Sequence, residues 1–242
     1  MIVAAKTDIG KMRSENQDRY RVNQISDDTA IAVVCDGMGG THGGGLASEM
    51  ASNVVYERLY LSYREGMEPR TVKNLMVSAV TAANTVVYDK SREDAENHGM
   101  GTTCVAALVH SGAVSVASVG DSRAYILDSS GIRQITNDHT VVQYLKAHGI
   151  IDDGEMQSHR MKNVITRAVG VEEKIDVDYF ELYAEKGSTL LICTDGLTNY
   201  ITDELMYTMA YKTAPEQAVA DLVNYANQGG GKDNITVALI MI

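Results

Sequence analysis

Residues 30–40 read Ala-Ile-Ala-Val-Val-Cys-Asp-Gly-Met-Gly-Gly, an apolar run that ends in an aspartate. The run has the length and composition of a buried β-strand. A carboxylate beside such a strand costs free energy unless something pairs with it. Three more aspartates, Asp121, Asp195 and Asp233, lie at the ends of other apolar runs. Four such residues predict one shared cation cluster, and therefore a metal-dependent hydrolase.

Strands and helices come in alternating sets along the chain. Apolar runs predict strands at 1–6, 19–25, 30–35, 103–110, 113–119, 123–127, 132–135, 177–183, 189–193 and 235–242. Helical spacing of apolar residues predicts helices at 44–63, 70–90, 202–211 and 214–227. Thr213 and Glu216 have the spacing of a capping box for the last helix, with Pro215 in its first turn. Because strands adjoin strands and helices adjoin helices, we expect an α+β fold with antiparallel sheets, packed face to face and covered by helix pairs, rather than βαβ repeats.

Composition and charge argue against several classes of function. The 242 residues favour one large domain, and 45% of them are hydrophobic, which is enough for a sizeable core. A net charge of −11 without a strong basic run makes nucleic acid an unfavourable partner. The three cysteines form no C-x-x-C pair and are typical of buried thiols in a reducing compartment. We expect no signal peptide, because residues 1–8 lack a basic region and a long apolar region, and the apolar stretches are far shorter than the roughly 20 residues that span a bilayer. We therefore expect a soluble cytoplasmic protein without membrane insertion.

Hairpin geometry predicts that the strand-end aspartates meet. Folding about the turn at 26–29 sets Asp18, just before one strand, opposite Asp36, just after the next. Folding about 111–112 sets Asp121 near residues 101–102. Asp195 follows a strand and Asp233 precedes one, so both lie at one sheet edge if those strands pair antiparallel. That the three edges coincide is a hypothesis.

An all-carboxylate cluster favours hard divalent cations. Oxygen ligands suit Mg²⁺ or Mn²⁺ better than Zn²⁺, and the histidines show no zinc-protease spacing. Two cations that share a carboxylate can lower the pKa of a bridging water and make it a nucleophile. The glycines after Asp36 and Asp195 would let the backbone approach such ions. In the segment 7–18, Arg13 could hold a phosphate through two hydrogen bonds.

The ordered motifs of the chain carry a resemblance to a known family. They are T-D-x-G-x-x-R-x-x-N-Q-D, D-G-M-G-G, G-x-G-T-T, G-D-S-R, I-T-R-A-x-G, D-G-L and G-G-x-D-N-I-T-V, and they extend from Thr7 to Val237. In this order they resemble the bacterial branch of the metal-dependent protein phosphatases (type 2C, PPM family). The resemblance implies a four-layer αββα sandwich, with 1–242 as a single catalytic domain and a flap at about 145–166.

The same resemblance implies the reaction and the partners. It implies hydrolysis of phosphoserine and phosphothreonine in proteins by a water activated by two metal ions, without a covalent intermediate. It also implies Mg²⁺ or Mn²⁺ as cofactor, with two core ions and a third. Phosphorylated proteins are the expected partners, with a cognate serine/threonine kinase as one candidate among them, and the protein is expected to be a monomer.

The roles of individual residues are likewise implied by the resemblance. Asp36 would bridge the two core ions, and the carbonyl of Gly37 would complete one site. Asp195 and Asp233 would hold the other core ion, and Asp121 a third ion. Arg13 would bind the substrate phosphate, and Asp18 would bind waters on the ions.

Two departures from the family pattern concern the general acid and the flap. Many bacterial relatives have histidine directly after D-G-M-G-G, whereas this chain has Thr41 there and His42 one position later. An acid must reach the leaving oxygen, so we expect His42 to be a surface loop residue near the site. In the flap, Arg160 follows His159 where relatives often have proline.

The sequence lacks the residues that other phosphatase and hydrolase mechanisms require, and two alternative functions remain open. A cysteine phosphatase needs arginine six positions after its cysteine, but those positions hold Thr41, His110 and Asn199. There is neither a G-x-x-x-x-G-K-[ST] loop nor a G-x-S-x-G elbow. The alternatives are a non-catalytic phosphoprotein-binding relative and a two-metal nuclease, the latter disfavoured because no basic groove is expected.

Overall fold

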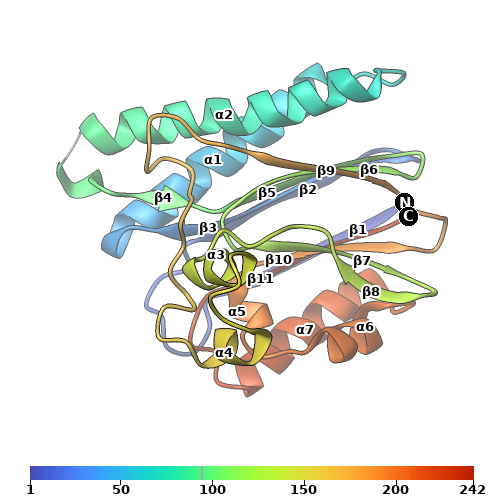
Figure 1. Ribbon diagram of the computed structural model, residues 1–242. Coiled ribbons are helices and arrows are strands. Elements are labelled where there is room, and N and C mark those ends of the chain that lie inside the picture. Colours follow the sequence, from blue (N-terminus) through green and yellow to red (C-terminus); the bar gives the residue numbers. More distant parts are fainter. Residues whose placement is uncertain (94) are drawn as a thin grey trace.

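Two antiparallel sheets stack face to face, and helices cover the outer face of each (Figure 1). The computed structural model describes residues 1–93 and 95–242, except for the side chains of Thr41, His42 and Gln157. Within this part of the chain, no helix is long and apolar enough to cross a bilayer. The four-layer sandwich expected from the sequence is confirmed.

The first sheet has the strand order β1-β11-β10-β7-β8. Its members are β1 (Ile2–Asp8), β7 (Arg123–Asp128), β8 (Gly131–Gln134), β10 (Thr189–Cys193) and β11 (Ile235–Met241). Strand β11 lies inside this sheet, with antiparallel partners β1 and β10 on its two sides. All seven of its residues except the last are buried, because the sheet is covered on both faces.

The second sheet has the order β2-β3-β5-β6-β9, with a short strand β4 paired to the end of β3. Its members are β2 (Asp18–Ser26), β3 (Thr29–Met38), β4 (Gly101–Thr102), β5 (Cys104–His110), β6 (Ala113–Val119) and β9 (Asp178–Tyr183). The apolar run that ends in Asp36 forms β3, which lies between β2 and β5. Its apolar residues 30–35 are fully buried or nearly so.

Two long helices cover the second sheet, and two shorter ones cover the first (Figure 1). The long pair is α1 (Gly40–Ser62) and α2 (Pro69–Glu93), and the other pair is α6 (Asp203–Ala210) and α7 (Pro215–Gln228). Three shorter α-helices and one 3₁₀ helix lie in the connections: α3 (Val141–Ala147), α4 (Asp153–Ser158), α5 (Asp195–Thr198) and η1 (Ala95–Asn97).

Three apolar layers hold the sandwich together. Val34, Val116 and Ile192 belong to the layer between the sheets. Leu59 and Met76 belong to the layer between α1, α2 and the second sheet. Leu191, Leu222 and Leu239 belong to the layer between the first sheet and its helices. These layers are mainly aliphatic, as the absence of Trp and the single Phe require.

Some local expectations were wrong. Helix α1 begins at Gly40 rather than at 44, so residue 42 is part of a helix and not of a loop. The side chain of His42, the acid considered above, lies outside the described part of the structure. The capping box is absent: Ala214 is the N-cap of α7, so Thr213 lies one residue too early to cap it. Pro215 does occupy the first turn of α7, where its missing N–H costs nothing.

Candidate metal centre

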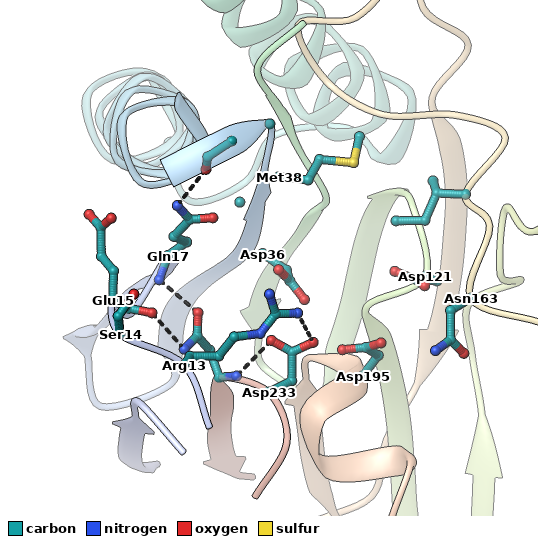
Figure 2. A pocket seen from close by; sticks show the side chains of 15 residues that line it. Arg13, Ser14, Glu15, Gln17, Asp36, Met38, Asp121, Asn163, Asp195 and Asp233 are labelled. Atoms are coloured by element: carbon teal, nitrogen blue, oxygen red, sulfur yellow. Dashed lines mark hydrogen bonds and ion pairs between the residues drawn. The ribbon is translucent and has the colours of Figure 1, made fainter. Parts of the chain in front are cut away.

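Four aspartates from both sheets line one cleft of about 650 Å³ (Figure 2). Asp36 lies near the end of β3, and Asp121 lies two residues after β6; both strands belong to the second sheet. Asp195 begins α5 just after β10, and Asp233 lies just before β11, both in the first sheet. The hypothesis that the sheet edges coincide is therefore supported by where these residues lie.

Strand register explains why they meet. Asp18 pairs directly with Asp36 across β2 and β3. Cys193 pairs with Val237 across β10 and β11, which places residues 195 and 233 at the same edge of the first sheet. Since a shift of one residue would turn every side chain to the other face, this register is strongly specified by the buried strands.

Hydroxyl groups on neighbouring strands hold Asp36 in place. Its backbone N–H donates to Thr103 Oγ1 at 2.9 Å. Its carbonyl accepts from the Thr103 N–H and from Thr102 Oγ1, both at 2.8 Å. Thr103 Oγ1 also lies 2.7 Å from Ser122 Oγ, the residue after Asp121. The backbone of Asp36 and the loop that carries Asp121 are thus tied to one threonine.

Asp18 lies beneath the cleft and is 1% exposed. Its Oδ2 accepts from Thr194 Oγ1 at 2.9 Å and from Thr236 Oγ1 at 2.7 Å. Its Oδ1 is buried and has no hydrogen-bond partner in the protein. Burial raises the pKa of Asp18 to about 7, against the lowering effect of the two threonine hydroxyls. A buried carboxylate oxygen without a donor fits a place where a water on a nearby cation would donate to it.

Burial and mutual repulsion also raise the pKa of the cleft carboxylates. Asp36 has a pKa well above its usual range, because of its burial and the charges of Asp18, Asp195, Asp121 and Asp233. Burial and Asp195 raise the pKa of Asp121 to about 7. Burial and Asp233 raise the pKa of Asp195 to about 6, although Asn199 Nδ2 donates to its Oδ2 at 3.1 Å. Asp36 and Asp195 are still reached by solvent, since they lie on the floor of an open cleft.

Arg13 places a positive charge against this cluster. Its Nη2 donates to Asp233 Oδ2 at 2.8 Å, and the side chain is 55% exposed (Figure 2). The Asp233 contact, followed by the charges of Asp36 and Asp195, outweighs burial and raises the Arg13 pKa. The arginine that is expected to bind phosphate therefore lies at the mouth of the cleft, and Nη2 of its guanidinium contacts Asp233, a candidate metal ligand.

The glycines beside the aspartates serve close backbone packing. A Cβ on Gly37 would lie 2.0 Å from the carbonyl oxygen of Gly44, and one on Gly196 would lie 1.9 Å from that of Asn234. Real Cβ atoms do not approach so closely, so each position requires glycine. The sequence predicts that these glycines let the backbone approach an ion; the structure gives them the further role of letting α1 and the segment before β11 approach the site.

The donor set fits divalent cations with oxygen preference. The candidate ligands are aspartates and a backbone carbonyl, and the raised pKa values of Asp36 and Asp121 indicate a site short of positive charge. Among the described residues, Asp28, Glu65 and His110 form a group whose potential metal-binding atoms lie within 4.8 Å of one another. This group lies away from the cleft. There, hydroxyls of Ser26 and Ser111 already hold Asp28. The wider spacing in the cleft suits ions that keep several waters, as Mg²⁺ does.

The sequence reasoning missed several supporting residues. Thr194 and Thr236 hold Asp18, Thr103 holds Asp36, and Asn199 orients Asp195. Thr103 and Thr236 lie inside the quoted motifs, so the motifs could have pointed to them. From the expected flap at 145–166, Asn163 and Ile165 reach the cleft, and Asn163 is visible in Figure 2. The described lining of the cleft contains neither histidine nor cysteine, but it does contain Met38.

Known proteins resemble this chain over nearly its whole length. The sequence pattern described as protein phosphatase 2C matches residues 11–236. The serine/threonine phosphatase stp of Listeria monocytogenes is 36% identical over 239 residues, which cover 97% of this chain and 93% of that protein.

Solved structures agree with the sequence comparison. The serine/threonine phosphatase Stp1 from Staphylococcus aureus superimposes with a TM-score of 0.91 at 33% identity, covering 99% of this chain and 94% of that one. The catalytic domain of the serine/threonine phosphatase PstP in complex with two manganese ions has a TM-score of 0.86 at 28% identity, covering 98% of this chain and 96% of that one. A pattern and relatives that span this much of the chain establish the family: the chain belongs to the protein phosphatase 2C family.

Proposed function

We propose that this protein is a metal-dependent serine/threonine phosphatase whose working site is the aspartate cleft. The observation that carries the proposal is the meeting of Asp36, Asp121, Asp195 and Asp233 from both sheets beside Arg13. Relatives named as serine/threonine phosphatases support the substrate class. The volume of the cleft, about 650 Å³, suits a phosphorylated side chain on a protein.

We assign the ligands as follows. Asp36, the Gly37 carbonyl, Asp195 and Asp233 would together hold two Mg²⁺ or Mn²⁺ ions, with Asp36 as a ligand common to both. Asp121 would hold a third ion. The manganese-bound PstP structure supports metal dependence, and the raised pKa values of Asp36, Asp121 and Asp195 support a site that needs cations.

When bound, such cations neutralise charge on the phosphoryl group and activate a water for attack on phosphorus. Arg13 binds the phosphoryl oxygens through its planar guanidinium and thereby orients the ester for in-line displacement. Asp18, through its free Oδ1, accepts a hydrogen bond from a water in the cleft and fixes its position.

No thiol chemistry competes with this assignment. Cys35, Cys104 and Cys193 are fully buried. Burial raises the pKa of Cys35 and of Cys193, so neither supplies a thiolate at neutral pH. We therefore propose direct attack by water, without a covalent enzyme intermediate.

We also propose that residues 1–242 work as one catalytic domain with a flap at 145–166, because both sheets and the flap supply residues to one cleft. Phosphorylated proteins are the substrates. A cognate kinase, a monomeric state and a cytoplasmic location stay predictions from the sequence.

The function is tested by phosphate release from a phosphothreonine peptide with Mn²⁺, with Mg²⁺ and with a chelator. We expect turnover with the metals and none with the chelator, since the carboxylates alone cannot activate water. Equal rates in every condition, or no turnover in any, would refute the proposal. The second result, combined with tight binding of the phosphopeptide, would favour a non-catalytic binding protein.

The bridging role is tested by Asp36→Asn, which keeps the side-chain shape and removes a ligand charge. We expect turnover to be abolished and the metal-free melting temperature to be equal or higher, because a repelling charge is gone. The matched control is Asp27→Asn in the exposed β2–β3 turn, which should behave as wild type. Near wild-type turnover of Asp36→Asn contradicts the assignment.

The phosphate-binding role is tested by Arg13→Ala. Loss of charge-assisted hydrogen bonds should lower kcat/KM for a phosphopeptide about 10- to 100-fold. Arg70→Ala, an exposed arginine in α2, is the control and should have no effect. If Arg13→Ala leaves kcat/KM unchanged, Arg13 serves only to neutralise Asp233.

The raised pKa values predict a pH-dependent stabilisation by metal. Asp18 and Asp121 titrate at about 7 and Asp195 at about 6 in the folded protein. In the unfolded chain they titrate near pH 4. Because folding raises these pKa values, the protonated carboxyl groups favour the folded state. Their contribution to the free energy of unfolding is fully present below pH 4 and is lost as the pH rises toward 7. Cations bind the ionised carboxylates, so their stabilising effect should grow over the same range.

Melting temperatures measured with Mn²⁺ and with chelator, from about pH 5 to about pH 8, check this linkage. The melting temperature with Mn²⁺ should exceed that with chelator by more as the pH rises. A difference that is constant or narrows with rising pH contradicts the link between the raised pKa values and metal binding.

A further inference from the structure

His139 lies between the loop that carries Asp121 and the base of the flap. Its side chain is buried, with 7% of the residue exposed. The preceding residue, Asp138, accepts from Arg123: Nη2 donates to Oδ2 at 2.6 Å, and Nε donates to Oδ1 and Oδ2 at 2.9 and 3.0 Å. None of the motifs quoted from the sequence includes His139, and it does not line the cleft. Its buried polar contacts therefore need an explanation of their own.

His139 binds both backbone polar groups of Gly120. Its Nδ1 accepts from the Gly120 N–H at 3.0 Å, and its own N–H donates to the Gly120 carbonyl at 2.9 Å. Gly120 has a positive φ of 102°, and a Cβ there would lie 2.6 Å from Thr103 Cγ2. The residue before Asp121 is thus fixed between His139 and the threonine that holds Asp36.

The other ring nitrogen is anchored by Asp178. Because Nδ1 accepts a hydrogen bond, the neutral ring carries its proton on Nε2, which lies 3.3 Å from Asp178 Oδ2. Arg167 Nη1 lies 3.1 Å from Nε2, but two donors cannot bond to each other, so it donates to Asp178 Oδ1 at 2.8 Å. Burial and the charge of Arg167 lower the pKa of His139, which keeps the ring neutral at pH 7.

The backbone of His139 also belongs to the base of the flap. Its carbonyl accepts from the Thr166 N–H at 2.7 Å, and the next residues continue the contact through the Thr140–Ile165 bridge and the Val141 N–H to Val164 carbonyl bond of 2.9 Å. We call residues 139–141 and 164–166 the flap stem. Figure 2 shows Asp121 on the same side of the cleft as Asn163, which precedes this stem.

We propose that His139 is a positioning residue that aims the Asp121 carboxylate at the third cation site and couples this aim to the flap stem. The proposal rests on the proposed role of Asp121 as a metal ligand. Removal of Nδ1 leaves the buried Gly120 N–H without an acceptor, so the Val119–Gly120 peptide loses its side-chain anchor and Asp121, the next residue, is held less firmly. Residues that orient metal ligands in this way typically contribute about 10- to 100-fold in metal affinity.

The test is Mn²⁺ binding, measured by calorimetry and by the electron paramagnetic resonance of free Mn²⁺, on the full chain. Asp121→Asn should lose the weakest binding event and keep the tighter ones. His139→Gln, whose amide does not reach the Nδ1 position, should weaken that same event about 10-fold. His139→Asn should restore it, because Asn Oδ1 takes the place of Nδ1 as acceptor. His98→Gln at the exposed end of η1 is the matched control and should bind as wild type.

A second variant covers the case in which His139→Gln does not fold. Asp178→Asn, at a side chain 31% exposed, loosens the ring from Nε2 and should weaken the same event. In the double variant His139→Gln with Asp121→Asn, no loss should follow beyond that of Asp121→Asn alone.

The outcomes separate the two proposals. If Asp121→Asn loses the weak event but His139→Gln and Asp178→Asn bind Mn²⁺ as wild type, the role of His139 is refuted and the metal assignment stands. Equal weakening of the tight events by His139→Gln also refutes it, since the role would then be general support. If Asp121→Asn keeps every event, both the third site and the role of His139 fail.

Discussion

Mutual repulsion among buried aspartates is the constraint on which the rest of this structure depends. Asp18, Asp36, Asp121 and Asp195 all have raised pKa values, and each is raised first by burial and then by other carboxylates. Arg13 offsets only part of this charge from the rim of the cleft. Gathering so many acids at the junction of two sheets costs stability as the pH rises and the carboxyl groups ionise, and divalent cations would supply compactly the positive charge that offsets this cost.

The sandwich holds these acids in place through its strand register and through hydroxyl groups. Strands β3 and β11 lie inside their sheets, and this positions Asp36 near the end of β3 and Asp233 two residues before β11. Thr103 ties the backbone of Asp36 to the loop of Asp121, while Thr194 and Thr236 bind Asp18. Neutral hydroxyls can orient a carboxylate without neutralising it, which leaves its charge available to a cation. His139 extends the same principle to the loop of Asp121 and the flap stem.

Much of this could be predicted from the sequence, because it depends on period and turn position. The turn at 26–29 was enough to place Asp18 opposite Asp36, and the pairing of residues 189–193 with 235–242 was enough to place Asp195 beside Asp233. The short helices α3, α4 and α5 were not predicted, since they have too few turns to show a helical period. The predicted N-cap of α7, Thr213, lies one residue before the observed N-cap, Ala214, because the helix begins at Pro215. The contact of Arg13 with Asp233 and the free Oδ1 of Asp18 depend on three-dimensional packing between distant segments, which no local pattern records.

The measurement that bears most directly on the account is an anomalous-scattering map from crystals grown with Mn²⁺. It locates the ions without reference to activity. The account predicts two strong manganese peaks that share the Asp36 carboxylate, one of them also beside Asp195 and Asp233. Manganese bound only elsewhere on the protein, with none at Asp36, would contradict it.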